Sequence, residues 1–271
     1  MRWKHAVVTG AGSGLGHGIA VRLLKHGVDV SAIDRAISDE RRDLLDAAAR
    51  AGGASWRMHV ADVTQRTAMQ DAVAAAISAH GPADLAAHFA GIGGLSSFEE
   101  MEDAEFYRMM DVNVNGSYHF ARAVIPHLRP GDRLALTASM AGITSNFGYT
   151  SYGTSKFAVL GLATTLRLEY EPRGIHVSVI CPPEIKTPMV ESEYARGNRI
   201  GIEVKQVAGS LQPDEACDAI FADLLAGKWM IIPSFKGKTI AFMATRMPGL
   251  FNFMTSRVIR KVMKKHGIPV A

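Results

Sequence analysis

The sequence predicts an α/β protein in which a seven-stranded, mainly parallel sheet is doubly wound and covered by helices on both faces. Short apolar, β-branched runs alternate along the chain with stretches of helical periodicity. Gly and Pro pairs separate these segments, and no tandem repeat, low-complexity stretch or linker interrupts the alternation. Such an alternation forms a parallel sheet with its ligand crevice at the carboxyl ends of the strands.

Length and composition set the broad class. The chain has 271 residues, 48% of them hydrophobic, which is enough for one large domain or two small ones. Because no linker divides it, we expect a single domain over residues 1–271. The two cysteines offer neither a disulfide framework nor a metal-ligand spacing, which indicates a reducing compartment and no metal site. The first residues lack the apolar core of a signal peptide, and no run approaches the roughly eighteen apolar residues of a membrane span. We therefore expect a cytoplasmic protein.

The positive charge is confined to the end of the chain. The net charge is +4, but the segment from Lys228 onward has nine Lys or Arg and no Asp or Glu. The preceding 227 residues hold 21 basic and 26 acidic side chains. The basic character therefore belongs to the tail and not to the body.

A glycine-rich turn follows the first expected strand, residues 6–9. The turn reads Gly10-Ala-Gly-Ser13-Gly14-Leu15-Gly16 and opens a helix with Leu15, Ile19 and Leu23 on one face. A strand, a glycine turn and a helix N-terminus together present backbone N–H groups to a pyrophosphate. A tight connection without a ligand is the simpler alternative, but this context favours phosphate binding.

An acidic residue ends the second expected strand, residues 28–33. Asp34 lies 18 positions after Gly16, close to the offset of a carboxylate that accepts from the 2′-hydroxyl of an adenosine ribose. A carboxylate there repels a 2′-phosphate, so NAD is favoured over NADP. The neighbouring Arg35 is the counter-argument, since a guanidinium could receive that phosphate.

The remaining elements follow in order. Further strands are expected at 54–61, 84–89, 133–138, 176–180 and 229–232. Ser38 and Thr64 stand where helix caps are expected. Asp62 and Val63 follow the third strand, at the level of the crevice. Asn113 falls inside a helix expected from about 102 to 128, where asparagine is a poor helix former, so a cap, a kink or a function is expected there.

The most informative stretch is Tyr152-Gly-Thr-Ser-Lys156, which opens the helix after the fifth strand. Tyr at i and Lys at i+4 lie on one face of a helix. An ammonium beside the phenol lowers the pKa of the tyrosine, and a general base near pH 7 needs about 4 kcal/mol of such stabilisation. One lysine rarely supplies this alone, so a second positive charge, such as an oxidised nicotinamide ring, is expected to contribute. Ser139, thirteen residues before the tyrosine, is delivered by the fifth strand.

In order and spacing these motifs resemble those of the short-chain dehydrogenases/reductases. The matching residues, from residue 6 to about 234, are Thr9-Gly10-x-x-x-Gly14-x-Gly16, Asp62-Val63, Asn113, Ser139 and Tyr152-x-x-x-Lys156. The resemblance implies a Rossmann-like fold with Asn113, Ser139, Tyr152 and Lys156 as a catalytic tetrad. In those roles Tyr152 exchanges the proton of an alcohol while hydride moves to or from the nicotinamide. Lys156 lowers the pKa of the tyrosine and holds the nicotinamide ribose, Ser139 orients the substrate oxygen, and Asn113 carries a water of a proton relay.

Two places depart from the family pattern. His88-Phe89-Ala90-Gly91 stands where the family usually has Asn-Asn-Ala-Gly, and Phe89 cannot make the hydrogen bonds of an asparagine beside the adenosine ribose. His88 could be an acid–base residue, although a packed or backbone-bonded histidine is the favoured interpretation. Pro182-Pro183 replaces the family's Pro-Gly and stiffens the nicotinamide loop, in which Ile185 and Thr187 keep their expected places.

Two segments after the sixth strand bear on the substrate. Residues 189–212 mix apolar and charged side chains, and by resemblance they form a mobile substrate lid. Residues 246–266 read as a basic amphipathic helix. It could lie on an anionic membrane or attract an acidic ligand such as a CoA ester, but packing over the substrate mouth or at a subunit interface is favoured. Nucleic-acid binding is not expected, because no recognition module is present.

Three functions are compatible with these features. The first is an NAD(H)-dependent alcohol dehydrogenase or carbonyl reductase acting on a secondary alcohol or ketone of a fairly apolar small molecule. The second, motivated by Arg35 and the basic tail, is an NADPH-dependent 3-oxoacyl-thioester reductase. The third, motivated by His88, Phe89 and Pro183, is a dinucleotide-binding regulatory protein without turnover, against which the intact tetrad argues. The resemblance also implies a homo-oligomer, a dimer or tetramer.

Overall fold

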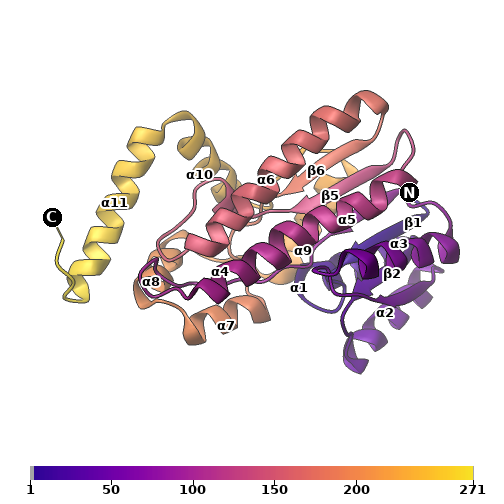
Figure 1. Ribbon diagram of the computed structural model, residues 1–271, viewed down its shortest axis with the longest axis horizontal. Coiled ribbons are helices and arrows are strands. Elements are labelled where there is room, and N and C mark those ends of the chain that lie inside the picture. The colour runs from indigo at the N-terminus through magenta and orange to yellow at the C-terminus, as the bar shows by residue number, and fades with distance from the viewer. Residues whose placement is uncertain (1–2, 271) are drawn as a thin grey trace.

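The computed structural model describes residues 3–270, so residues 1, 2 and 271 of the expected domain lie outside the described part. Its sheet has seven strands in the order β3-β2-β1-β4-β5-β6-β7, and every neighbouring pair is parallel. The strands are β1 His5–Thr9, β2 Asp29–Asp34, β3 Trp56–Val60, β4 Leu85–His88, β5 Arg133–Thr137, β6 His176–Ile180 and β7 Met230–Ile231. The predicted doubly wound, seven-stranded Rossmann-like sheet is thus confirmed (Figure 1).

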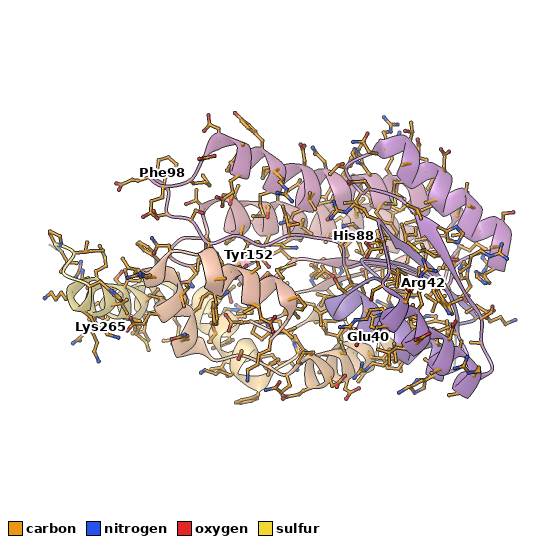
Figure 2. All side chains as sticks on the ribbon, turned by 90° about the horizontal axis from the view of Figure 1, so that it is seen from below. Glu40, Arg42, His88, Phe98, Tyr152 and Lys265 are labelled. Atoms are coloured by element: carbon orange, nitrogen blue, oxygen red, sulfur yellow. The ribbon has the colours of Figure 1, made fainter. Side chains whose placement is uncertain are left out.

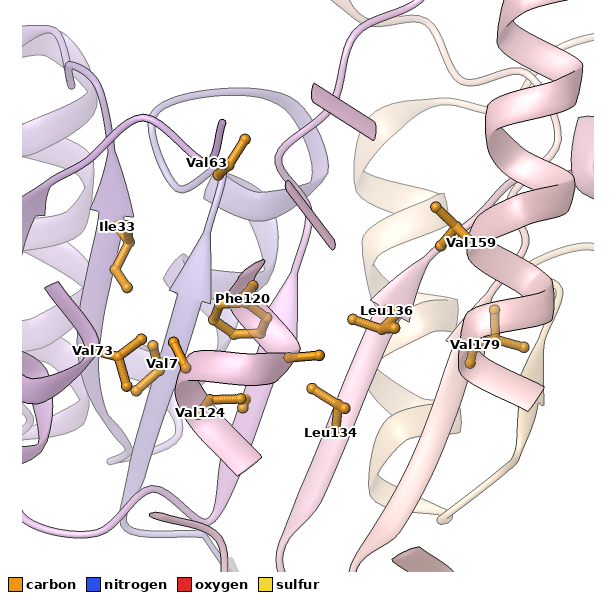
Figure 3. Packing of buried hydrophobic residues seen from close by; sticks show 14 of the residues in the cluster. Val7, Ile33, Val63, Val73, Phe120, Val124, Leu134, Leu136, Val159 and Val179 are labelled. Atoms are coloured by element: carbon orange, nitrogen blue, oxygen red, sulfur yellow. The ribbon is translucent and has the colours of Figure 1, made fainter. Parts of the chain in front are cut away.

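Helices cover both faces of this sheet. They are α1 Gly14–Lys25, α2 Asp39–Gly52, α3 Arg66–His80, α4 Asp103–Met110, α5 Gly116–Val124, α6 Thr150–Tyr170, α7 Pro188–Arg196, α8 Arg199–Ala208, α9 Pro213–Leu225, α10 Phe235–Arg246 and α11 Pro248–Lys265. Alternate strand residues point to opposite faces, so Val7 packs on one helical layer while Val8 packs on the other. The first layer is α3, α5 and α6, whose Phe120, Val124 and Val159 are seen around Leu134 and Leu136 in Figure 3. The second is α1, α2 and α9.

Most local expectations agree with the structure, with one clear exception. The Ser38 side chain accepts a hydrogen bond from the Arg41 N–H at the start of α2, as a cap does. Thr64 does not cap α3, which begins after Gln65. The Thr64 N–H and hydroxyl both donate to Asp62 Oδ1, at 2.9 and 2.8 Å, so Thr64 belongs to a local turn closed by the aspartate and lies one residue before the N-cap Gln65.

The irregularity expected at Asn113 is a π-helical turn. Residues Asp111–Asn115 form this turn between α4 and α5, which otherwise run on as one bent helix. Such turns widen the backbone by one residue and are frequent at functional sites. Here the turn carries the Asn113 side chain into the protein interior.

The chain reverses its direction of travel across the sheet between β1 and β4. Connections from β1 lead outward to β2 and β3, and those from β4 lead the opposite way to β5, β6 and β7. A crevice opens at such a switch point at the carboxyl ends of the strands. Within residues 3–270, no helix is long and apolar enough to cross a membrane, and no cluster of three or more His, Cys, Asp or Glu is placed to hold a metal.

Candidate active site

A cavity of about 1310 Å³ lies at the carboxyl ends of the strands. It brings together residues from all the motifs named above except Asn113. The expected site residues that line it are Gly10, Ser13, Gly14, Leu15, Asp34, Arg35, Asp62, Val63, Phe89, Ala90, Gly91, Ser139, Tyr152, Lys156, Pro182, Ile185 and Thr187. Gly16 and Asn113 are not among the lining residues and lie behind the wall.

The β1–α1 turn has the features of an anion cradle. Ser13 precedes α1 in extended conformation and makes no side-chain cap, and the first turn of α1 has no acidic residue. The N–H groups of a first helical turn have no partners inside the helix, so these are free to bind phosphate oxygens. Gly14 has a φ of +52°, and a Cβ there would meet nothing closer than 3.9 Å, which leaves its backbone open to the cavity. The turn therefore fits a dinucleotide pyrophosphate.

Gly16 serves packing and not contact with the cavity. A Cβ at this position would lie 2.2 Å from the carbonyl oxygen of Gly10. Only a glycine lets α1 approach β1 this closely, and that approach places the helix N-terminus at the cavity.

Asp34 and Arg35 lie at the far end of the cavity, where β2 ends. The Asp34 carboxylate accepts hydrogen bonds from the backbone N–H of Gly12 at 2.8 Å and of Arg35 at 2.7 Å. The Arg35 side chain is 74% exposed, and its Nη1 lies 4.0 Å from Asp62 Oδ2. A fixed carboxylate beside the glycine turn fits a ribose diol, while the guanidinium is held only loosely.

His88 is a structural residue. It is fully buried, its Nδ1 shares a hydrogen bond of 2.8 Å with the Thr9 hydroxyl, and its ring stacks on Phe120. Burial, with a smaller contribution from Lys156, lowers its pKa to about 3. The histidine is therefore neutral at physiological pH, as the packed interpretation requires. The Thr9 oxygen also accepts from the Phe89 N–H at 3.1 Å, so Thr9 and His88 hold β1 to β4 without an asparagine.

Tyr152 and Ser139 meet on the cavity wall. The Ser139 side chain caps the turn at 140–142 by accepting from the Ala141 N–H at 3.1 Å, and it hydrogen-bonds the Tyr152 phenol. Burial nevertheless raises the pKa of Tyr152 to about 12, with Ser139 acting in the opposite direction. The sequence-based expectation of a lowered pKa is thus not met in the protein alone, because desolvation outweighs the lowering contribution of the hydrogen bond.

Lys156 is also buried, one turn further along α6. Its ammonium donates to the carbonyl of Thr137 at 3.0 Å and lies 5.7 Å from the centroid of the Tyr152 ring. Burial lowers the pKa of Lys156 to about 8. The ammonium therefore faces the ring and the cavity without bonding the phenol oxygen directly.

The buried Asn113 side chain lies close to Lys156, behind the cavity wall. Its Oδ1 accepts from the Ile92 N–H at 2.9 Å, and its Nδ2 donates to the Ile92 carbonyl at 3.0 Å and to Ser155 Oγ at 3.0 Å. A Cβ on Gly91 would come within 3.0 Å of Asn113 Oδ1 and 3.5 Å of Lys156 Nζ. The asparagine thus pins the strand extension after β4 beside the lysine.

The loop after β6 closes the opposite wall. The Pro182 carbonyl accepts from the Met140 N–H at 2.9 Å, so the loop is tied to the segment that carries Ser139. Ile185 pairs with Leu211 in an isolated bridge, which holds the loop to the end of the lid segment.

A buried charge cluster beside Tyr152 was not foreseen from the sequence. Lys205 on α8 contacts Glu193 on α7 at 2.5 Å and Glu184 at 3.0 Å, and all three side chains are at most 10% exposed. Tyr149 donates to Glu193 at 3.4 Å and packs on the Tyr152 ring with 4.9 Å between centroids. No motif signals these contacts, because their partners lie in separate elements.

Comparison with known proteins decides the family. A model described as "short chain dehydrogenase" matches residues 4–197. This chain belongs to that family. Oxidoreductase UcpA of Salmonella typhimurium is 36% identical over 202 residues, which are 72% of this chain and 74% of that protein. The 3-dehydrosphinganine reductase TSC10B of Arabidopsis thaliana is 29% identical over 91% of this chain and 75% of that protein.

Solved structures agree with the fold. A short-chain dehydrogenase/reductase from Burkholderia phymatum, in complex with NAD, has a TM-score of 0.78 at 24% identity and covers 91% of this chain and 94% of that one. Levodione reductase has a TM-score of 0.74 at 27% identity and covers 84% of this chain and 95% of that one. The chain is thus a short-chain dehydrogenase/reductase oxidoreductase with the family's sheet and helices.

Proposed function

We propose that this short-chain dehydrogenase transfers hydride between NAD(H) and a secondary alcohol or ketone of a fairly apolar small molecule. The observation that carries the proposal is that Ser139, Tyr152 and Lys156 share one cavity with a glycine turn and the carboxylate of Asp34. The first three supply proton transfer and orientation, and the last two suit a dinucleotide.

The cofactor would be held by groups already in position. The backbone of Ser13, Gly14 and Leu15 would bind the pyrophosphate, and Asp34 the adenosine ribose. Ala90 and Gly91 line the cavity between these groups and Lys156, which would hold the nicotinamide ribose. Ile185 and Thr187 would face the nicotinamide amide. When bound, the nicotinamide ring supplies or accepts the hydride.

The proton would move at the phenol oxygen of Tyr152. Since burial raises its pKa to about 12, the protein alone holds this group as the neutral phenol, the form that donates a proton to a carbonyl oxygen being reduced. Ser139 would hydrogen-bond the same substrate oxygen. For alcohol oxidation the phenolate is required, and the Lys156 ammonium 5.7 Å from the ring, together with a cationic cofactor, would favour it.

We propose two supporting roles around this centre. Asn113 would fix the backbone at Ile92, and through it the position of Gly91 beside Lys156, since both ends of its amide are bonded to Ile92. The relay water expected on Asn113 stays a prediction. Asp62 and Val63 would flank the adenine, where Asp62 is itself held by Thr64.

The cavity also supports an apolar substrate. Apolar side chains from five different helices or connecting segments line it, namely Met140, Met189, Leu211, Met243 and Phe251. The relatives' names add two substrate classes to try, since they include 3-dehydrosphinganine reductase and 3beta-hydroxysteroid dehydrogenase. The first substrate panel would therefore contain sphingoid ketones, hydroxysteroids and aromatic alcohols. Turnover of each compound would be measured by the change in NADH absorbance.

The cofactor preference is a separate measurement. We expect NADH to bind at least tenfold more tightly than NADPH, because Asp34 is fixed by two backbone N–H groups and repels a 2′-phosphate. Tighter NADPH binding would favour the thioester-reductase alternative, in which the exposed Arg35 receives the phosphate.

The catalytic role of Tyr152 is tested with a matched pair of variants. Tyr152→Phe should lower kcat by about 10²–10⁴-fold while NADH binding, followed by its fluorescence, stays near normal. Tyr149→Phe removes a hydroxyl from the adjacent ring, 4.9 Å away, and should retain most turnover. Full activity of Tyr152→Phe would exclude the phenol as the proton donor. NADH binding without turnover of any panel member by the unaltered protein would favour the non-catalytic alternative.

A further inference from the structure

The last two helices form a hairpin that stands out from one end of the molecule. This C-terminal hairpin consists of α10 and α11, and Figure 1 shows it reaching away from the sheet and its covering helices. Lys265, near its far end, lies well away from the interior position of Tyr152 (Figure 2). From residue 228 to the C-terminus the sequence has nine Lys or Arg and no Asp or Glu.

The inner side of the hairpin lines the cavity and packs on α8. Ile240, Met243 and Phe251 line the cavity, which makes the hairpin part of its wall. Val258 and Val262 pack on Ile200 and Val204 of α8. Near the end of α11, Lys265 and His266 both contact the Glu203 carboxylate of α8, at 2.7 and 2.9 Å. The hairpin is therefore fixed to the lid segment by its inner face.

The outer side carries large apolar side chains that the described part of the chain leaves exposed. Phe235 is 86%, Phe242 60% and Phe253 59% exposed. Met247 is 46% and Leu250 44% exposed, whereas Met254, although 48% exposed, also lines the cavity. Two consecutive helices with this many exposed large apolar groups are unusual on a soluble protein without a partner.

Basic residues share this outer side at helical spacing. On α10, Phe235, Lys238 and Phe242 follow each other at i, i+3 and i+7, which is one helix face. On α11, Leu250 and Phe253 occupy the first turns, and the same exposed face continues with Arg257, Arg260, Lys261 and Lys264. Exposed apolar residues that share helix faces with Lys and Arg, without acidic residues, are suited to the surface of an anionic membrane.

We propose that the outer face of the C-terminal hairpin binds the surface of an anionic lipid bilayer. Phe242, Leu250 and Phe253 enter the headgroup region, and the basic residues of α11 contact lipid phosphates. A second copy of this chain is a poorer occupant, since pairing two hairpins through this face would oppose two surfaces that both lack acidic residues. Lipid binding does not depend on the proposed reaction, although it would place one wall of the cavity at the bilayer, where apolar substrates dissolve.

The test uses flotation of the full-length protein with vesicles of phosphatidylcholine alone or mixed with phosphatidylglycerol. Binding is expected only to the anionic vesicles and should weaken in high salt. The variant Phe242→Ser/Phe253→Ser should lower the partition coefficient by about tenfold or more. Phe98→Ser is the matched control, because Phe98 is 77% exposed but lies in the loop before α4, outside the hairpin. Replacing Arg257, Arg260 and Lys261 by Gln should remove the preference for anionic lipid.

Folding and assembly are followed in the same samples. The variants should keep the melting temperature and NADH affinity of the unaltered protein, because neither Phe242 nor Phe253 lines the cavity. Equal binding to neutral and anionic vesicles, an equal loss with Phe98→Ser, or no binding at all would overturn the proposal. The proposal would also be overturned if Phe242→Ser/Phe253→Ser changed the oligomer mass measured by light scattering but left vesicle binding unaltered. The outer face would then be a subunit interface.

Discussion

Removing the Lys205 ammonium should destabilise the protein far more than removing a surface lysine. In Lys205→Met the carboxylates of Glu184 and Glu193, which it contacts at 3.0 and 2.5 Å, are left together in a buried site with no positive partner. Breaking a buried ion pair by deleting one member costs about 3–5 kcal/mol. At about 2–4 °C per kcal/mol for a chain of this size, the melting temperature should fall by about 6–20 °C.

Lys228→Met is the matched control for this experiment. Lys228 contacts Asp223 at 2.6 Å, but its side chain is 48% exposed, so we expect a loss of only about 0–1 kcal/mol. Differential scanning calorimetry and urea unfolding of both variants provide the comparison. Equal losses would refute the idea that burial gives the Lys205 cluster its importance. Replacing all three members at once, Lys205→Met with Glu184→Gln and Glu193→Gln, should recover most of the loss, because no buried charge then stays uncompensated.

Two further predictions concern packing and pH. Gly16→Ala should lower the free energy of unfolding in urea by about 1–3 kcal/mol or more and weaken NADH binding, since the new Cβ would lie 2.2 Å from the Gly10 carbonyl oxygen. The control is Gly161→Ala on α6, where a Cβ would meet nothing within 4 Å, and it should be neutral or stabilising by about 0.5–1 kcal/mol. Similar losses of stability in both variants would contradict the packing argument. His88→Asn should reduce the acid sensitivity of stability. The folded protein keeps His88 neutral down to a pKa of about 3 while the unfolded chain takes up a proton near 6.5, so stability is full above pH 6.5 and falls below it. Unfolding curves between pH 6 and 4 should show a slope smaller by about 1.4 kcal/mol per pH unit in the variant, and an unchanged slope would mean that His88 is not held neutral.

Local pattern was sufficient for much of the fold. The strand at His176–Ile180 and the beginning of the strand at Arg133 were predicted to the residue, because short apolar runs bounded by Gly and Pro have few alternatives. Thr64 is not the helix cap because hydrogen bonds from its N–H and hydroxyl to Asp62 hold it in a local turn, and the helix begins one residue later than a cap at Thr64 would require. Capping depends on such local competition, which residue type alone does not resolve.

For the candidate site, too, the residues could be predicted from local pattern but their surroundings could not. Motif spacing was enough to choose Ser139, Tyr152 and Asp34, since parallel strands end at one edge of the sheet and deliver their following residues to a shared crevice. The burial of these groups, and hence their pKa values, could not be predicted from motif spacing. The expected lowering of the pKa of Tyr152 gave way to a raised value of about 12, because the degree of burial depends on what packs over the phenol.

By itself the sequence determined the order of the strands, the glycine turn, the family and the basic tail, all of which are properties of neighbours along the chain or of spacing within one element, whereas the helices α7 and α8 of the lid segment and α10 were not predicted. Only the tertiary structure decided that Lys205, Glu193 and Glu184 form a buried cluster beside Tyr149, and that the outer side of the hairpin leaves Phe242 and Phe253 uncovered. The physical reason is that burial and charge pairing depend on distances between elements far apart in sequence. No local pattern encodes those distances, which arise when the helices pack.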